Sequence, residues 1–133
     1  MVAELKRLAP EEKSLHASDS YTGSQHFFYA VPVPVRRQLV KDWLKENKDA
    51  EPKEVLALCD ALFRGKSHEE KTMASYLLGY HTEARQAVSI KQLDSWLDEL
   101  IGWAEIDALC QNNFTGEELL ENWSAWETFL LKL

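Results

Sequence analysis

The sequence predicts an all-α fold, and two of its features carry that prediction. Apolar residues recur at intervals of three and four wherever they cluster, whereas alternation over the length of a strand is hard to find. The segments are about ten to fifteen residues long and are joined by short turns, which is typical of stacked antiparallel helix pairs. We expect residues 1–133 to form one domain, an α-α superhelix of HEAT- or armadillo-like pairs, with a four- or five-helix bundle as the alternative.

The first half of the chain is predicted to contain three helices. A short helix over residues 2–8 precedes a polar, turn-rich stretch. The apolar segment 25–34 contains two prolines, which remove backbone donors and favour extended neighbours, so we expect a buried connector there. Pro34 then opens the second helix, and Pro52 opens the third, which ends at Gly65. Their inward residues are predicted to be Val35, Leu39, Trp43 and Leu44, and then Val55, Leu58, Cys59, Leu62 and Phe63.

The second half begins with a helix capped by Ser67, where Glu70 three residues later completes a capping box. A helix is predicted over residues 89–101, and shorter ones over 104–111 and 116–133. The inward residues of the two longer helices are predicted to be Met73, Tyr76, Leu77 and Tyr80, and then Leu93, Trp96, Leu97 and Leu100. The end of the chain is strongly apolar, unlike the polar face of a terminal repeat, so it predicts either a shortened chain or self-association.

Charge is distributed unevenly along the chain. The formal net charge of −7 and the pI near 5.1 by themselves argue against nucleic-acid binding. Residues 1–66 hold eleven Lys and Arg and ten Asp and Glu, whereas residues 67–133 hold four and twelve. A basic cluster lies on the second predicted helix and its C-terminal end, and its last four members share one face: Arg36, Arg37, Lys41, Lys45 and Lys48. This basic face is either a solvated surface or a contact for a polyanion.

Several classes of protein are disfavoured. No stretch approaches the ~20 uncharged apolar residues that span a bilayer, and residues 1–7 are not followed by the apolar core of a signal peptide, so we expect a cytoplasmic protein. The histidines are scattered and no His and Cys have the spacing of metal ligands, so we expect no bound metal. Cys59 and Cys110 lie in apolar helical patterns, and both are predicted to be buried free thiols.

One pair of residues forms a candidate site. Trp103 and Asp107 are four residues apart on a helix that begins after Gly102, so the indole and the carboxylate lie on one side, a turn apart. Asp107 has apolar neighbours, and Asp is rarely buried without a partner. The pair is either a core Trp beside a first-turn Asp, or an aromatic wall beside an anion, which suits a cationic ligand.

Several segments together resemble the AlkD-like DNA alkylation repair family. Residues 21–37, YTGSQHFFYAVPVPVRR, resemble its entry segment, and residues 68–71, HEEK, followed by Leu77-Leu78, resemble its hEeR…lL helix. Residues 93–96, LDSW, and 102–107, GWAEID, resemble the helix pair that ends in the family's W-x-x-x-D, which is the most specific part. The resemblance covers about residues 21–111.

This resemblance implies a solenoid whose concave, basic face holds duplex DNA with alkylated bases. Family members hydrolyse the N-glycosidic bond of cationic N3- and N7-alkylpurines without a cofactor. By this analogy Asp107 would stabilise the oxocarbenium-like transition state and position the attacking water, and Trp103 would contact the deoxyribose. Arg36, Arg37 and Lys41 would lie near the DNA backbone.

The sequence departs from the family pattern at several positions. Ala30 stands where the family usually has Gly, and Lys71 where it usually has Arg. Members carry an Arg after the W-x-x-x-D helix, but here no Arg follows Arg85. We therefore expect the N-terminal portion of such an enzyme, or a short relative without the C-terminal repeats. The alternative is a non-catalytic helical-repeat module that binds protein or DNA, which the acidic second half favours.

Overall fold

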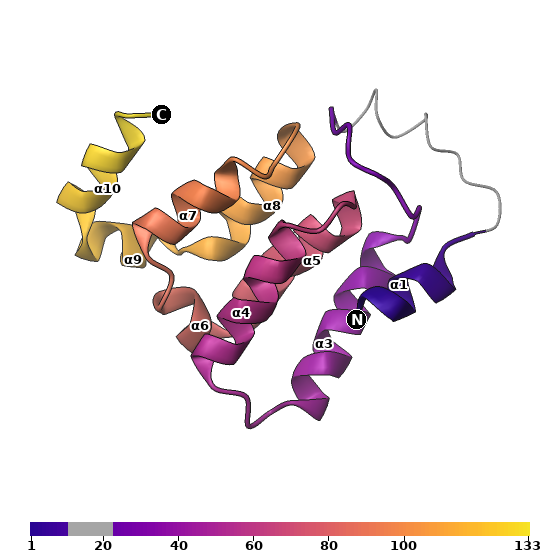
Figure 1. The fold of residues 1–133 in the computed structure, drawn as a ribbon. Helices are drawn as coiled ribbons and strands as arrows, with labels where there is room; N and C mark the ends of the chain where they lie inside the picture. The colour runs from indigo at the N-terminus through magenta and orange to yellow at the C-terminus, as the bar shows by residue number, and fades with distance from the viewer. Residues whose placement is uncertain (11–22) are drawn as a thin grey trace.

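The computed structural model describes residues 1–10 and 23–133, and the secondary structure in these ranges is helical apart from one isolated bridge (Figure 1). The helices follow in the order α1 (Val2–Leu8), α3 (Val33–Glu46), α4 (Pro52–Phe63), α5 (His68–Tyr80), α6 (Thr82–Gln86), α7 (Ile90–Leu97), α8 (Trp103–Asn113), α9 (Gly116–Glu121) and α10 (Trp123–Leu130). The all-α prediction is confirmed. Most of the predicted turn-rich stretch lies outside the described ranges, and no helix within them is long and apolar enough to cross a bilayer.

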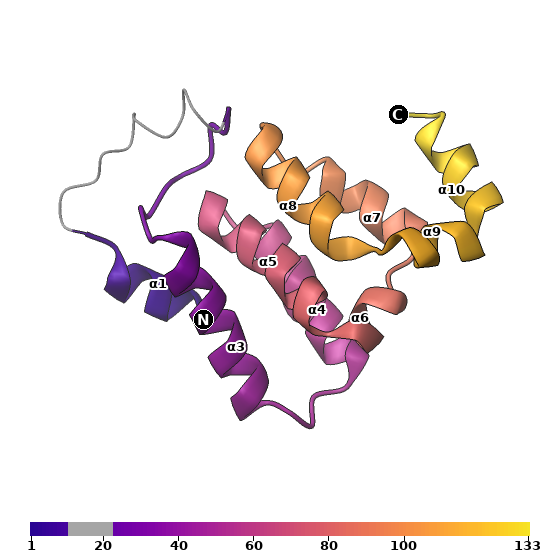
Figure 2. The same cartoon turned by 180° about the vertical axis from the view of Figure 1, so that it is seen from behind.

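The central helices form two layers. Helices α4 and α7 lie nearer the viewer in Figure 1, and α5 and α8 lie nearer the viewer in Figure 2, which shows the other side. Helix α5 packs against α3, α4 and α8, so every residue from 68 to 78 is buried. Helices α9 and α10 lie at the end of the molecule away from α1. Helix α5 is therefore the element around which the others are arranged.

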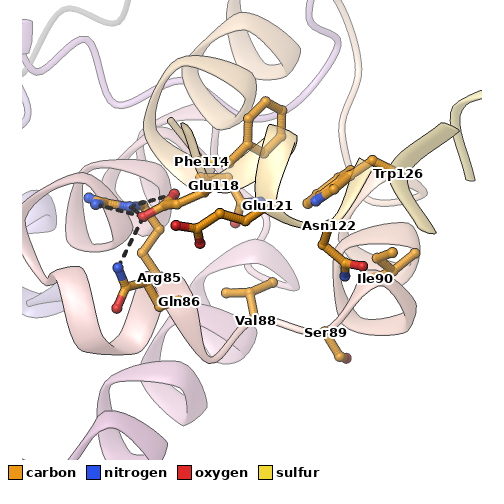
Figure 3. A pocket seen from close by; sticks show the side chains of 11 residues that line it. Arg85, Gln86, Val88, Ser89, Ile90, Phe114, Glu118, Glu121, Asn122 and Trp126 are labelled. Carbon is orange, nitrogen blue, oxygen red and sulfur yellow. Dashed lines mark hydrogen bonds and ion pairs between the residues drawn. The ribbon is translucent and has the colours of Figure 1, made fainter. Parts of the chain in front are cut away.

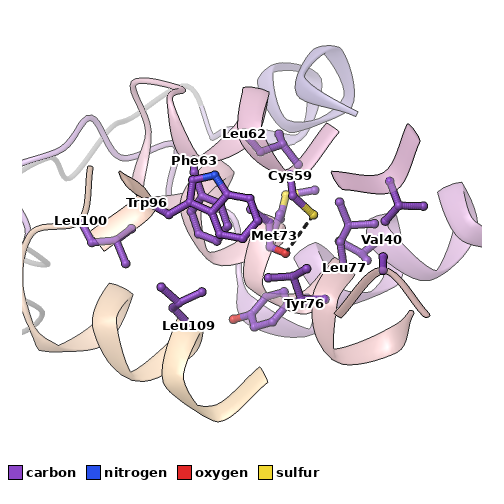
Figure 4. Close-up of a cluster of buried hydrophobic side chains, with 14 of the residues drawn as sticks. Val40, Cys59, Leu62, Phe63, Met73, Tyr76, Leu77, Trp96, Leu100 and Leu109 are labelled. Carbon is purple, nitrogen blue, oxygen red and sulfur yellow. Dashed lines mark hydrogen bonds between the residues drawn. The ribbon is translucent and has the colours of Figure 1, made fainter. Parts of the chain in front are cut away.

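The apolar core lies between α4, α5, α7 and α8 (Figure 4). Trp96 of α7 is fully buried, and its ring lies 4.7 Å from that of Phe63 at the end of α4. Cys59 is also fully buried, and its Sγ donates a weak hydrogen bond to the Ala74 carbonyl at 3.7 Å. Burial raises the pKa of the Cys59 thiol to about 12, so this cysteine is an inert core residue.

The residues that were predicted to begin helices α3, α4 and α5 lie at or just before the first turns of those helices in the structure. Pro52 is the first residue of α4, and Pro34 lies in the first turn of α3. Ser67 caps α5 by accepting a hydrogen bond from the Glu70 N–H, and the Glu70 side chain accepts one from the Ser67 N–H in return. Just before this cap, the Phe27 carbonyl accepts a hydrogen bond from the His68 N–H at 2.8 Å. The connector before α3 is thereby tied to the start of α5.

Helix α7 is shorter than predicted. It ends at Leu97, and the next residues form a turn with i to i+3 bonds, including one from the Leu100 N–H to the Leu97 carbonyl. This turn buries Leu100 and frees the Ile101 N–H to donate to Glu105 on α8 at 2.8 Å. A hydrogen bond at the start of α8, from the Ile101 N–H to a side chain four residues later, therefore replaces the continuation of α7 that the periodicity of residues 98–101 predicts.

Some side chains predicted inside lie elsewhere. Cys110 is exposed, because α8 turns Leu109 to the core and the next residue is rotated by about 100°. Tyr80 is 37 % exposed at the end of α5. On α3 the buried residues are Arg36 and Val40, whereas the predicted Val35, Leu39, Trp43 and Leu44 are only partly buried against the core.

Lys71 is buried on α5, although Lys is seldom buried. Its ammonium donates to the Phe63 carbonyl at 2.6 Å and to the Gly65 carbonyl at 2.9 Å. These carbonyls lie at the C-terminal end of α4, where a positive charge is favourable. Lys71 therefore joins α5 to α4.

Ala30 has a φ of 61°, in the left-handed region that costs a residue with a Cβ about 1–2 kcal/mol. We expect Ala30→Gly to raise the free energy of unfolding by about 0.5–1 kcal/mol, because the relief of strain exceeds the entropy that glycine adds to the unfolded chain. Urea denaturation measures the change. Ala87→Gly, at a φ of −87°, has no strain to relieve and is expected to destabilise. Equal effects at the two positions would contradict the prediction.

Candidate functional site

The predicted catalytic pair lies at the start of α8, with both side chains at the surface. Trp103 is the first residue of α8 and is 51 % exposed, and Asp107 follows one turn later, also exposed. Gly102 caps the helix with a φ of 85°, and a Cβ on Gly23 would lie 3.4 Å from the Gly102 Cα. The two glycines thus let the connector pass close to the helix start. The interpretation of Trp103 as a core residue is wrong.

A pocket of about 280 Å³ lies between α3, α5 and α8 and contains this pair. Its lining residues are Val33, Arg36, Arg37, His68, Thr72, Tyr76, Trp103, Ala104, Asp107, Ala108, Gln111 and Asn112. Four of the five residues predicted for the site therefore border one pocket, although they are separated by about 70 positions in the sequence. The fifth, Lys41, does not line it. We call this the α3/α5/α8 pocket.

Arg36 forms part of the wall of this pocket and is only 5 % exposed. Its Nη1 donates to the Thr72 hydroxyl at 2.5 Å, and its buried Nε has no hydrogen-bond partner among residues 1–10 and 23–133. Burial lowers the pKa of its guanidinium, but arginine stays charged in proteins. Arg36 therefore supplies a fixed positive charge beneath the pocket.

Arg37 and Lys41 lie further out along the same helix, over two tyrosines of α5. The Arg37 guanidinium lies 4.2 Å from the centre of the Tyr76 ring and donates to the Tyr80 hydroxyl at 2.9 Å. The Lys41 ammonium lies 5.3 Å from the centre of the Tyr80 ring. These cation–π contacts hold the positive charges on the side of α3 that faces α5.

The buried acid of α8 is Glu105 and not Asp107, contrary to what the apolar neighbours of Asp107 suggested. Glu105 is 1 % exposed and accepts hydrogen bonds from three sides. Its Oε1 lies 2.6 Å from the Ser24 hydroxyl, 2.9 Å from His26 Nδ1 and 3.0 Å from His68 Nδ1. Its Oε2 accepts from the Ile101 N–H.

Two opposing effects act on the charge of Glu105. Burial raises its pKa, but hydrogen bonds from His68, the Ile101 backbone, Ser24 and His26 together outweigh burial and bring the pKa below its ordinary value. Glu105 is therefore an ionised carboxylate at neutral pH. By contrast, no described residue hydrogen-bonds to the exposed carboxylate of Asp107.

Sequence reasoning missed this network. Glu105 lies between the Trp and the Asp of the W-x-x-x-D motif, and its histidine partners lie in residues 21–37 and 68–71, two of the other segments that resemble the family. The one feature of the sequence that could have indicated the network is Glu105 itself, a second acid among the apolar residues of the helix that carries Asp107. Nothing local indicated that Ser24 and His26 reach it, because they are 81 and 79 positions away.

A second pocket, of about 570 Å³, lies between α6, α9 and α10 (Figure 3). It is bordered by an ion pair in which Arg85 lies 3.1 Å from Glu118, and by the ring of Trp126. It contains none of the predicted site residues. Across the described ranges, no group of three or more His, Cys, Asp or Glu is arranged to hold a metal ion.

Comparison with known proteins bears on the function of the α3/α5/α8 pocket. No curated protein and no solved structure matches the chain. The family model described as DNA alkylation repair enzyme matches residues 1–132, which include α3, α5 and α8. A match over nearly the whole chain is sufficient to assign the family. This chain is therefore a member of the DNA alkylation repair enzyme family, in agreement with the resemblance of its motifs.

Proposed function

We propose that the α3/α5/α8 pocket is the active site of a DNA glycosylase that hydrolyses the N-glycosidic bond of cationic N3- and N7-alkylated purines in duplex DNA. The observation that carries this proposal is the set of side chains on one pocket: the exposed Trp103, the exposed Asp107 and two guanidinium groups. Family membership supports a role in the repair of alkylated DNA.

The chemistry of the substrate matches this set. An alkylated purine that is already cationic leaves without being protonated, so the enzyme mainly has to stabilise positive charge on the deoxyribose. The carboxylate of Asp107 supplies a negative charge for the oxocarbenium-like transition state, and no described residue competes for its oxygens. The π face of Trp103 adds a second favourable contact for the same charge.

The basic side of α3 is suited to hold the DNA backbone beside this pair. Arg36 and Arg37 border the pocket, and Lys41 continues the positive surface along the helix. The net charge of −7 does not oppose such binding, because phosphate contacts depend on the local arrangement of cations. Phosphates held by α3 would place the deoxyribose close to the start of α8.

Single-turnover release of N7-methylguanine from duplex DNA tests the proposal. We expect Asp107→Asn to lower the rate by about tenfold or more without weakening DNA binding, because the variant removes the charge and keeps the shape. Asp94→Asn, the same change at an exposed residue of the neighbouring α7, serves as the matched control and should leave the rate unchanged.

Two results would contradict the proposal. Equal release by wild type and Asp107→Asn would remove Asp107 from the active site. Absence of release by the wild type, together with equal affinity for intact and alkylated duplexes, would instead favour the non-catalytic binding module.

A further inference from the structure

His68 connects the buried Glu105 to the α3/α5/α8 pocket. It is the first residue of α5, and its Nδ1 lies 3.0 Å from Glu105 Oε1. The residue also borders the pocket that contains Trp103 and Asp107, although it is only 4 % exposed. The Phe28 ring packs against the imidazole with 5.5 Å between ring centres, which restricts its rotation. The imidazole is thus held in one orientation at the wall of the pocket.

The hydrogen bond to Glu105 determines which ring nitrogen carries hydrogen. An ionised carboxylate accepts hydrogen bonds and cannot donate one, so Nδ1 of His68 has to be the donor. In the neutral ring Nε2 then keeps its lone pair, and no hydrogen bond between described residues occupies it. A carboxylate that fixes the tautomer of an imidazole in this way is the arrangement that prepares a histidine for general-base catalysis.

We infer that His68 is the general base of the proposed glycosylase and that Glu105 is its positioning residue. This inference rests on the proposed function. The oxygen of the attacking water forms a bond to C1′, and the C1′–N9 bond breaks with its electron pair returning to the purine ring. The cationic purine leaves as a neutral base, and the proton of the water is transferred to Nε2 of His68. Asp107 continues to stabilise the charge on the sugar.

The charges around His68 come from every side of the pocket. Glu105 and Asp107 on α8 favour the imidazolium that forms during the reaction. Arg36 and Arg37 on α3 oppose it, as does His26 when that histidine is protonated. Glu105 is the only one of these groups that hydrogen-bonds to His68 within the described residues, so it has the most direct influence.

His26 provides a matched control within the same network. Its Nδ1 also lies within hydrogen-bond distance of Glu105 Oε1, at 2.9 Å, but His26 is not among the residues that line the pocket. His26→Gln and His68→Gln each remove one histidine partner of the same carboxylate. Only the second variant removes the proposed base.

The decisive experiment is the pH dependence of N7-methylguanine release under single-turnover conditions. The wild-type rate should fall on the acid side, where Nε2 becomes protonated. His68→Gln should lower the rate near pH 7 by about tenfold or more and abolish this acid-side fall. His26→Gln should retain both the rate near pH 7 and an acid-side fall, and it should move that fall only toward higher pH, because it removes a cation that opposes the imidazolium. Glu105→Gln should move the fall to lower pH, because the imidazolium loses its anionic partner.

The outcomes separate this inference from the function on which it rests. If the wild type releases the base, and His68→Gln has the same rate and the same pH profile, His68 is not the base and the proposed function stands. If the wild type releases no base at any pH, both are overturned. Nitrogen NMR of the folded wild type provides a readout that is independent of activity and of the folding of any variant. The neutral His68 should be the Nδ1–H tautomer, and the Nε2–H tautomer would overturn the inference.

Discussion

Replacing Glu105 with leucine is expected to lower the free energy of unfolding by about 4 kcal/mol, the scale seen when one partner is removed from a buried charged network. The leucine removes an acceptor from the Ser24 hydroxyl, from two histidines and from the Ile101 N–H, and among these residues Ser24 and His68 are nearly fully buried. Urea denaturation near pH 7 measures the loss. A loss below about 1 kcal/mol would show that the network does not stabilise the fold.

The same carboxylate predicts a pH dependence of stability. Because the folded-state pKa of Glu105 is below its ordinary value of 4.5, its stabilisation is complete above pH 4.5 and is lost as the pH falls through the lower folded value. The stability difference between wild type and Glu105→Gln should therefore narrow as the pH falls below 4.5. A constant difference would contradict an ionised Glu105.

Trp96→Ala is expected to have an effect of similar size, about 4 kcal/mol, because it removes the largest fully buried side chain of the core. The indole packs on Phe63 and donates its N–H to Asp60 Oδ1 at 2.9 Å. The alanine variant therefore leaves a cavity between α4, α5 and α7 and also removes a hydrogen bond. Thermal or urea unfolding measures the sum of the two losses.

Trp96→Phe separates the cavity from the hydrogen bond. It keeps most of the ring and should cost about 1.5 kcal/mol. The Trp96 N–H is the main reason that the pKa of Asp60 is low, with Arg64 second, so the phenylalanine variant should raise the pKa of Asp60 toward its ordinary value. NMR titration of Asp60 measures this shift. Equal losses of stability in the two variants would show that the ring volume is not what matters.

Local signals were sufficient to predict most of the helix starts. Pro34, Pro52 and the Ser67–Glu70 pair act through backbone groups within one turn, so the sequence displays them directly. The predicted end of α7 was wrong by several residues, because the chain leaves the helix at Leu97 and the Ile101 N–H donates instead to Glu105, four residues later at the start of α8. Periodicity carries no information about such a bond.

The candidate site could likewise be predicted from the sequence only where its residues lie on one helix. Trp103 and Asp107 are a turn apart on one helix, so their common side follows from spacing alone. That Arg36 and Arg37 border the same pocket depends on the packing of α3 and α8 around α5, which no local pattern records. Net charge was also a poor guide, because −7 for the whole chain conceals three cations on α3 that lie beside or near the pocket.

The burial of α5 along nearly its whole length has a consequence for the divergence of related sequences. A helix with one solvent face can accept substitutions there, but residues 68–78 have no such face. They also supply the contacts of Glu69 with the Tyr29 and Val31 N–H groups, of Lys71 with α4 and of Thr72 with Arg36. We expect distant relatives to vary freely at exposed positions such as Leu120 and Leu131 while retaining this one segment. Residues 68–78 are thus the part of the chain by which remote homologues should be easiest to identify.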